Sequence, residues 1–229
     1  NVDASNELGA TPLWLAASNG SEILVEKLLS AGANPNVRLK RGETPLMSAS
    51  RAGNADTVVL LLNAGGDVNA AEDERGQTAL MWAVAQSHAA VAALLLENGA
   101  DLNTRTKVWY QLENTAGNTN PSGNFRMAHG GSSAIMFAAR VGDIDTTRVL
   151  LEAGANVNDT AASGVSVLIQ AAHSGHEELA IYLLDQGADP NAMDAGYTPL
   201  HAAVLRSEVT LARSLLDHGA IIETTVEHG

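Results

Sequence analysis

The sequence predicts an all-α solenoid of helix-turn-helix pairs with finger loops between them. Three observations support this prediction. A segment that begins with glycine recurs six times, each copy runs into an aliphatic stretch with a Leu-Leu pair, and each stretch ends at another glycine. Self-similarity at a period of about 33 residues is typical of repeat architectures in which each repeat is one supersecondary unit. The closing glycines are Gly32, Gly65, Gly99, Gly154, Gly187 and Gly219.

The start of each copy has the composition of a short helix with a defined first turn. A Thr or Ser stands two residues after the opening glycine, where its side chain can cap a helix, and Pro follows it in three copies. The helix is rich in Ala, so a neighbouring helix can approach closely. The expected capping residues are Thr11, Thr44, Thr78, Ser133, Ser166 and Thr198.

The second helix of each copy is aliphatic, and its Leu-Leu pair, as at Leu28-Leu29, marks the face that packs. The closing glycine supplies the positive φ that ends such a helix. An asparagine then recurs at one register, where we expect its short amide to tie down the turn backbone. These asparagines are Asn36, Asn69, Asn103, Asn158 and Asn191.

The Thr-Pro-Leu starts, the Ala pairs and the Gly-Ala-Asp-x-Asn ends resemble the ankyrin repeat family. The resemblance covers nearly the whole chain, and six registered copies make it specific. It implies antiparallel helix pairs stacked side by side in one domain, 1–229, with finger loops at one edge. The uneven copies are typical of a natural array, for which we expect a bacterial source. The expected repeats are 5–37, 38–70, 71–103, 128–159, 160–192 and 193–224.

The two ends of such an array need a polar outer side, because nothing stacks on them. One register of the second helices is polar only at its first and last members, which we interpret as capping. Residues 1–4 look like the tail of an earlier finger, so we expect the natural chain to be longer. The members of this register are Lys27, Leu60, Leu94, Val149, Tyr182 and Ser214.

One interval between closing glycines is 55 residues instead of 33, which indicates an insertion of 55 − 33 = 22 residues. The resulting insertion loop, 104–131, is rich in Asn and Gly and holds Trp109, Tyr110 and Phe125. Long loops tend to be functional or disordered. Three interpretations stay open: contact with a partner, aromatic side chains packed on the adjacent fingers, or disorder of the middle. We favour docked aromatic ends and a mobile tip from 114 to 124.

The composition narrows the classes of function. A net charge of −13 argues against nucleic acid as the main partner, because neutralising phosphates needs a cationic face. The absence of cysteine excludes disulfides, thiol nucleophiles and cysteine-based metal sites. No apolar run approaches the roughly 20 residues of a membrane helix, and no signal peptide is visible, so we expect no membrane contact. The compartment stays open, with the cytoplasm favoured.

No motif in the sequence indicates catalysis, a cofactor or a metal. His88, His176 and His201 occupy registers where the ankyrin family often has histidine, so we expect structural roles for them. His176 begins HEELA, like a zinc-protease helix, but Ala180 stands where that motif needs its second histidine. No other cluster has metal-ligand spacing, and no glycine-rich phosphate loop occurs. We therefore expect a non-catalytic protein without cofactors.

The resemblance places partner contacts on the finger tips and the exposed ends of the first helices, which form a concave surface in the family. Five of the 13 basic residues fall at these registers, and the insertion adds Arg105, Lys107 and Arg126 against Glu113. Together with acidic second helices, this predicts a relatively basic inner face. The alternative is that these arginines are solvated tips without function. The expected contact residues are Arg41, Arg51, Arg75, Gln77, Trp109, Tyr110, Phe125, Arg126, Arg140, His173, Tyr197 and Arg206.

The predicted function is a non-catalytic protein–protein interaction module that binds its partner through the finger and helix surface and the inserted loop. Aromatic residues and arginine dominate binding hot spots, so the partner is expected to be a protein with an acidic or mixed patch. We expect a monomeric domain, with self-association through the ends as the alternative. The alternative function is a regulatory or targeting segment of a larger multidomain enzyme.

Overall fold

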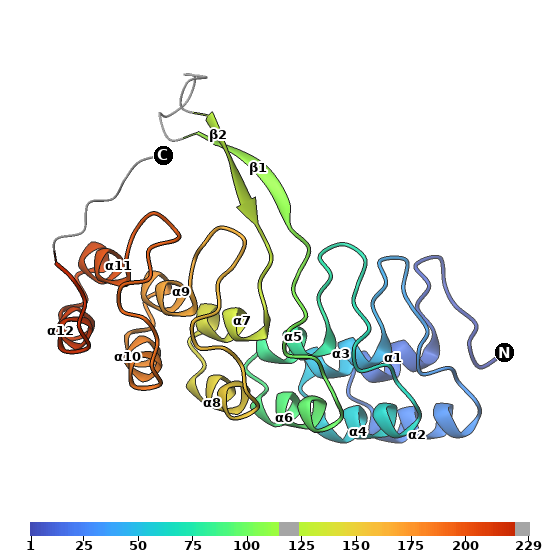
Figure 1. Ribbon diagram of the computed structural model, residues 1–229. Helices are drawn as coiled ribbons and strands as arrows, with labels where there is room; N and C mark the ends of the chain where they lie inside the picture. The colour runs from blue at the N-terminus through green and yellow to red at the C-terminus, as the bar shows by residue number, and fades with distance from the viewer. Residues whose placement is uncertain (115–123, 223–229) are drawn as a thin grey trace. The chain divides into compact units, whose positions relative to one another are not determined.

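The computed structural model describes residues 1–114 and 124–222, apart from the side chains of Asn114, Asn124 and Phe125. Within this part the chain is all-α except for one two-stranded antiparallel sheet, as Figure 1 shows. The chain divides into two compact units. Unit 1 is Asn1–Thr104 with Asp143–Ala155, and unit 2 is Arg105–Gly142 with Asn156–Gly229.

Unit 1 consists of two rows of short helices. The first helices of its repeats pack side by side, and the second helices form a parallel row against them (Figure 1). The first row is α1 (Pro12–Ser18), α3 (Pro45–Ala52) and α5 (Ala79–Val84). The second row is α2 (Glu22–Ser30), α4 (Ala55–Asn63), α6 (Ala89–Glu97) and α8 (Ile144–Glu152).

Unit 2 has the same two rows and carries the strands. Its first helices are α7 (Ala134–Val141), α9 (Val167–Ser174) and α11 (Pro199–Arg206). Its second helices are α10 (Glu177–Asp185) and α12 (Val209–Asp217). The strands β1 (Trp109–Asn114) and β2 (Asn124–His129) form one antiparallel ribbon.

Small side chains let the first helices of each unit approach one another. The sixth residue from each capping residue, counted inclusively, is an alanine with almost no exposed surface. The second helices bury larger aliphatic side chains, such as Val25, Val58 and Leu183, and each fully buried one contributes about 1.5–3 kcal/mol. The buried alanines are Ala16, Ala49, Ala83, Ala138, Ala171 and Ala203.

The helix caps follow the sequence prediction with one exception. The Thr or Ser side chain accepts a hydrogen bond from the third following N–H at five of the six predicted positions. The prediction was wrong for Ser133, which makes no such bond and donates its hydroxyl to Asp159 instead. This hydroxyl is used between fingers and not for its own helix.

The end of a first helix is tied to the next repeat by a side chain at α3, α7 and α9. Nε2 of His88 lies 3.1 Å from the carbonyl of Arg51, and Nε2 of His176 lies 2.9 Å from that of Arg140. The structural role expected for these histidines is therefore confirmed. Arg206 makes the corresponding bond, from its guanidinium to the carbonyl of His173 at 3.3 Å.

The recurring asparagines link fingers of neighbouring repeats, whereas their own turns are tied by the side chain two residues earlier, as by Asn34. The amide of Asn36 donates to the carbonyl of Gly65 at 2.9 Å and accepts from the N–H of Asp67 at 2.8 Å. Asn69, Asn158 and Asn191 make the same pair of bonds to the following repeat. The amides therefore tie down the backbone of the following repeat and not that of their own turn, which corrects the sequence prediction.

The insertion is an elongated finger. A backbone hydrogen bond closes the base of an ordinary finger, from Leu39 N–H to the carbonyl of Glu43 (2.9 Å) or from Ala161 N–H to that of Val165 (2.9 Å). The corresponding bond joins Thr106 N–H to the carbonyl of Ser132 at 3.0 Å, with residues 107–131 between its ends. The expected loop differs from the structure, because 109–114 and 124–129 are strands. Residues 115–123, which make up most of the tip that was expected to be mobile, lie outside the described residues.

The base of this hairpin is closely packed around one glycine. Trp109 pairs with His129 across the strands, and their rings are stacked with centroids 5.7 Å apart. Gly130 follows with a φ of 79°, and a Cβ there would meet the carbonyl oxygen of Lys107 and the Trp109 ring at 2.7 Å. No side chain fits between this backbone and the indole.

The capping predicted for the last repeat is only partly realised. Ser214 is half-buried on α12, but the free side of α11 leaves Val204 and Leu205 largely exposed. These side chains border an apolar groove of about 360 Å³. The groove is lined by Leu200, His201, Val204, Leu205, Ile221 and Ile222.

Replacing Gly130 with alanine should destabilise the hairpin base more than the backbone conformation alone requires. Gly65→Ala is the matched control, because Gly65 has a φ of 85° and no atom lies within 4 Å of the place that a methyl group would take. Both variants lose about 1 kcal/mol from the left-handed conformation. Gly130→Ala should lose a further 1–3 kcal/mol, roughly, through overpacking against the Lys107 carbonyl and the Trp109 ring. Urea unfolding of both variants measures this, and equal losses would contradict the packing described for Trp109.

Candidate functional site

The finger tips of unit 1 carry the predicted contact residues Arg41 and Arg75, both exposed. The guanidinium of Arg41 lies 3.3 Å from the carboxylate of Glu74 on the next finger. The carboxylate of Glu72 is buried and accepts hydrogen bonds from the N–H groups of Glu74, Arg75 and Gln77. This buried acid therefore fixes the finger that presents Arg75.

Arg51 and Gln77 are brought together by a tryptophan that is absent from the predicted contact residues. Trp82, on α5, is half-buried, and the guanidinium carbon of Arg51 lies 4.9 Å from its ring centroid. The indole N–H donates to Oε1 of Gln77 at 3.1 Å. The sequence shows that Trp82 lies on a first helix, four residues after the capping Thr78, but no local pattern pairs it with Arg51 of the preceding repeat.

The first helices of unit 2 carry a second set of predicted residues. Arg140 lies over the buried ring of Phe137, 5.3 Å from its centroid. His173 and Tyr197 have ring centroids 6.2 Å apart with tilted planes, and burial raises the pKa of the Tyr197 phenol. Arg206 is the least available of these residues for contact with a partner, because its guanidinium donates to the carbonyl of His173 and pairs with Glu208 at 3.1 Å.

The hairpin separates its two predicted aromatic residues onto opposite faces. Trp109 packs against His129 and Gly130, whereas Tyr110 and Leu112 point to the other face and are 61% and 62% exposed. Arg126 lies on that same face, with its guanidinium 5.2 Å from the Tyr110 ring. Phe125 belongs to β2, but its side chain lies outside the described part of the chain.

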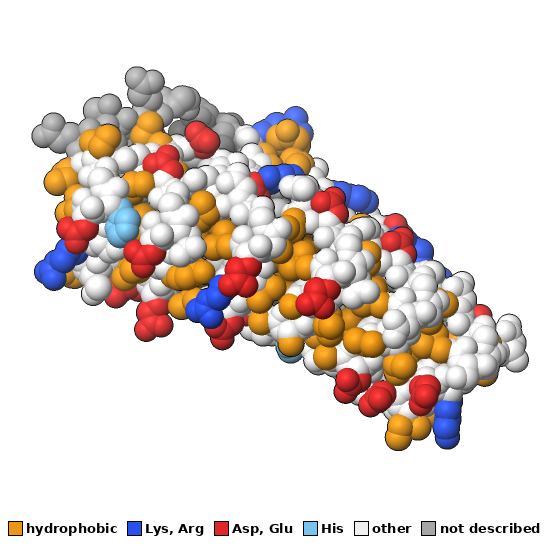
Figure 2. Space-filling view, turned by 60° about the horizontal axis from the view of Figure 1, so that its bottom comes forward, with side chains coloured by type: hydrophobic (Ala, Val, Ile, Leu, Met, Phe, Trp, Pro, Cys, Tyr) orange, Lys and Arg blue, Asp and Glu red, His pale blue; other side chains and the backbone are white. Residues whose placement is uncertain are grey.

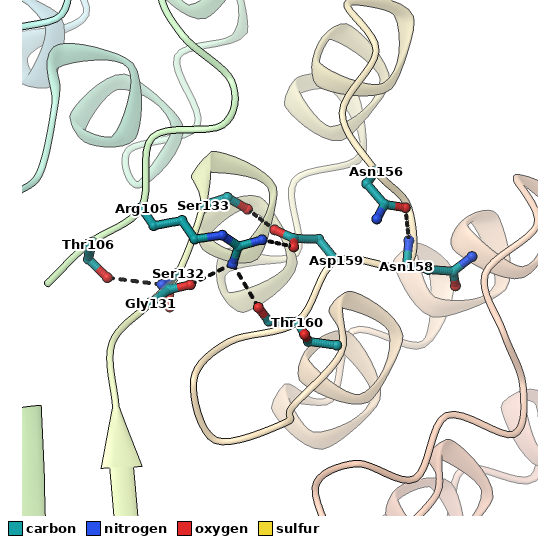
Figure 3. A network of polar contacts seen from close by, with 9 residues as sticks. All are labelled: Arg105, Thr106, Gly131, Ser132, Ser133, Asn156, Asn158, Asp159 and Thr160. Carbon is teal, nitrogen blue, oxygen red and sulfur yellow. Dashed lines mark hydrogen bonds and ion pairs between the residues drawn. The ribbon is translucent and has the colours of Figure 1, made fainter. Parts of the chain in front are cut away.

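Arg105 ties the hairpin base to the following finger (Figure 3). Its guanidinium donates to the carbonyls of Gly131 (2.7 Å) and Thr160 (2.8 Å) and pairs with the buried carboxylate of Asp159. Asp159 also accepts from the hydroxyl of Ser133. Arg105 was expected to add to a basic inner face, but its charge is compensated here. Arg38, at the same register in unit 1, makes the analogous bonds to Ala71 and Asp73.

Eight of the ten arginines therefore fall into two groups. Arg38, Arg41, Arg105, Arg148 and Arg206 each pair with a carboxylate. Arg51, Arg126 and Arg140 lie over aromatic rings, and among the described residues no carboxylate is within ion-pair distance of these three. Figure 2, which turns the second helices toward the viewer, shows Asp and Glu dispersed among hydrophobic side chains. Exposed acids on those helices include Glu22, Glu26, Glu97, Glu152 and Glu178.

The described residues contain no group of three or more His, Cys, Asp or Glu side chains arranged to hold a metal ion. None of the helices in residues 1–114 and 124–222 is long and apolar enough to span a membrane.

Removing Arg105 should destabilise the protein more than removing its counterpart Arg38. Arg105→Ala leaves the carboxylate of Asp159 buried without its cation, whereas the partner of Arg38, Asp73, is exposed. We expect a loss of about 2 kcal/mol for Arg105→Ala, discounted because Arg105 itself is half-exposed, and less than about 1 kcal/mol for Arg38→Ala. Urea unfolding at neutral pH measures both. Equal effects would mean that the buried pair contributes no more than a surface pair.

Comparison with known proteins agrees with this architecture. A family model described as ankyrin repeats (3 copies) matches residues 13–106, 113–194 and 135–226. The E3 ubiquitin-protein ligase KEG of Arabidopsis thaliana is 32% identical over 96% of this chain, and an inactive serine/threonine-protein kinase, TEX14 of Bos taurus, is 44% identical over 32% of it. The matches cover 13% and 5% of those two proteins, so this chain spans only a small part of their length.

A solved structure gives the same result for the fold. The ankyrin repeat domain of human ASB11 superposes with a TM-score of 0.75 and 26% identity, over 94% of this chain and 86% of that one. Ankyrin repeats are protein–protein interaction modules, and the fold is typically non-catalytic. With its six registered helix pairs and the family match along nearly its full length, the chain belongs to the ankyrin repeat family.

Proposed function

We propose that this chain is a non-catalytic binding module that contacts a protein partner through its finger and first-helix surfaces and, in unit 2, through the exposed face of the hairpin. The observation that carries the proposal is the pair of exposed side chains Tyr110 and Leu112 beside Arg126. The strands hold these side chains in place before any partner arrives. Such preorganisation lowers the entropy lost on binding.

The chemistry of the hairpin face favours a protein as the partner. Tyr and Arg are the residue types most enriched at binding hot spots, and an apolar neighbour such as Leu112 provides area that a partner can cover. The cation of Arg126 fits an acidic or mixed patch on that partner. A chain of net charge −13 is poorly suited to phosphate backbones, so nucleic acid is not the proposed ligand. We propose a monomeric domain.

A second candidate function follows from the length of the relatives. The Arabidopsis relative is a ubiquitin ligase by name, and the segment similar to this chain makes up 13% of it. The chain would then be the regulatory or targeting segment of a larger enzyme, and catalysis would belong to another domain of that enzyme. The length of the intact reading frame in the source genome distinguishes this candidate from an independent module.

Substitution of the exposed hairpin face should remove partner binding without affecting stability. Tyr110→Ala/Leu112→Ser changes two exposed side chains, so the melting temperature should stay constant. Partner affinity should fall at least about tenfold, as for a hot-spot pair. The partner is first captured from source lysate and identified by mass spectrometry, and its affinity is then measured with purified proteins.

The matched control is Ile23→Ser/Leu24→Ser on α2, which removes side chains of similar exposure (66% and 53%) from a second helix. It should bind the partner like the parent chain. Equal affinity of the hairpin variant and the parent would rule out the hairpin face as the contact. Trp109→Ala, in contrast, should lower the melting temperature, because Trp109 packs on His129 and Gly130.

A further inference from the structure

Arg51 is held in place at the end of its helix. It lies in the last turn of α3, and its backbone carbonyl is bonded to Nε2 of His88 from the next repeat. Gly53, two residues on, has a φ of 74°, and a Cβ there would collide with the His88 ring at 2.5 Å from Cε1. The backbone that carries Arg51 is therefore fixed by the scaffold, while its side chain is exposed.

The aromatic ring below the guanidinium is also fixed. The indole N–H of Trp82 donates to Oε1 of Gln77, and the backbone N–H of Gln77 donates to the buried carboxylate of Glu72 at 2.9 Å. A cation over an indole is stabilised by the ring quadrupole, and this contact uses no N–H donor of the guanidinium. The stack therefore orients Arg51 and leaves its donors available.

The charge of Arg51 is not compensated within its surroundings. No carboxylate in the described residues lies within ion-pair distance of it, although the chain carries 26 acidic residues and five other arginines have found such partners. A planar guanidinium with free donors is well matched to a carboxylate, which it can bind through two parallel hydrogen bonds. Lysine cannot reproduce this geometry.

We propose that Arg51, Trp82 and Gln77 form a carboxylate-binding site that receives the side chain of a Glu or Asp in a partner protein. Arg51 binds the carboxylate, the indole of Trp82 orients the guanidinium and packs against the neighbouring apolar group of the partner, and Gln77 positions the indole. The inference rests on the proposed function, which it deepens by naming the group that unit 1 recognises.

The test uses nitrogen-15 NMR of the whole chain with two peptides, acetyl-Leu-Glu-Leu-amide and acetyl-Leu-Gln-Leu-amide. The indole N–H signal of Trp82 is assigned by its loss in Trp82→Phe. The glutamate peptide should shift the Trp82 indole and the Arg51 Nε–H signals to saturation, and the glutamine peptide should bind at least about tenfold more weakly. Equal binding of the two peptides, or no shift with either at about 10 mM, a concentration that reveals even weak ligands, would overturn the proposal.

Two variants and one anion define the chemistry further. Arg51→Lys keeps the charge and should abolish the shift of the Trp82 indole. Arg148→Lys, the same change at an arginine of unit 1 that pairs with Asp145, should leave it intact. A parallel loss in both variants would refute the assignment. Inorganic phosphate at matched ionic strength should shift the two signals far less than the glutamate peptide, because it has no apolar group to pack on the indole of Trp82. Shifts as large as those from the glutamate peptide would show a general anion site instead.

The outcomes separate this inference from the proposed function. Loss of partner binding in the hairpin variant, together with no response to either peptide, would support the proposed binding module and refute the carboxylate site. A specific response to the glutamate peptide without any effect of the hairpin variant would sustain the site and refute the hairpin contact.

Discussion

The structure of each unit depends on the fact that one helix pair cannot bury its own apolar faces. A first helix of six to eight residues has too little surface to form a core with its partner helix alone. The solution is a neighbour on either side, and close approach requires a small side chain at the contact. This is why a fully buried alanine recurs at one position of the first helices, for example Ala49 and Ala171. A larger side chain at this position would push two neighbouring first helices apart and would not only change the packing within one helix.

The stacked helices also have backbone carbonyl groups at their ends that need hydrogen-bond donors, and the sequence provides such donors at regular intervals. A first helix ends with carbonyl groups that lack an intrahelical partner. After four of these helices, a side chain of the next repeat forms a hydrogen bond with a carbonyl at or just beyond the helix end. Asn54, His88, His176 and Arg206 all do this, with different chemical groups. Histidines that resemble catalytic candidates are thereby used in the scaffold. Arg206, which the sequence suggested as a contact residue, has the same structural use.

Periodicity made the helices, their caps and their closing glycines predictable, because each of these depends on neighbours within a few residues. The features that were missed depend on contacts over longer sequence distances. Ser133 bonds to Asp159 instead of capping its helix, and Arg105 reaches the same carboxylate. The hairpin was missed because only three of its twelve strand residues are aromatic or β-branched. In addition, nine residues, 115–123, separate the strands, whereas hairpin loops usually have two to five. Trp82 was missed because no local pattern pairs it with Arg51.

The distribution of arginines separates those that link fingers from those that lie over aromatic rings. Where an arginine links two fingers, as Arg105 does, a carboxylate compensates its charge and backbone carbonyls take its other donors. Where it lies over an aromatic ring, as at Arg51 and Arg126, the side chain is oriented but its donors bond to no carboxylate among the described residues. An aromatic ring thus orients the guanidinium and leaves its N–H donors available for hydrogen bonds, whereas a carboxylate occupies those donors. Alanine contacts, caps and finger bonds hold the described helices together, and the guanidinium groups of Arg51 and Arg126 take no part in these contacts. This is the physical reason for proposing these two arginines, and not the finger-linking ones, for partner contacts.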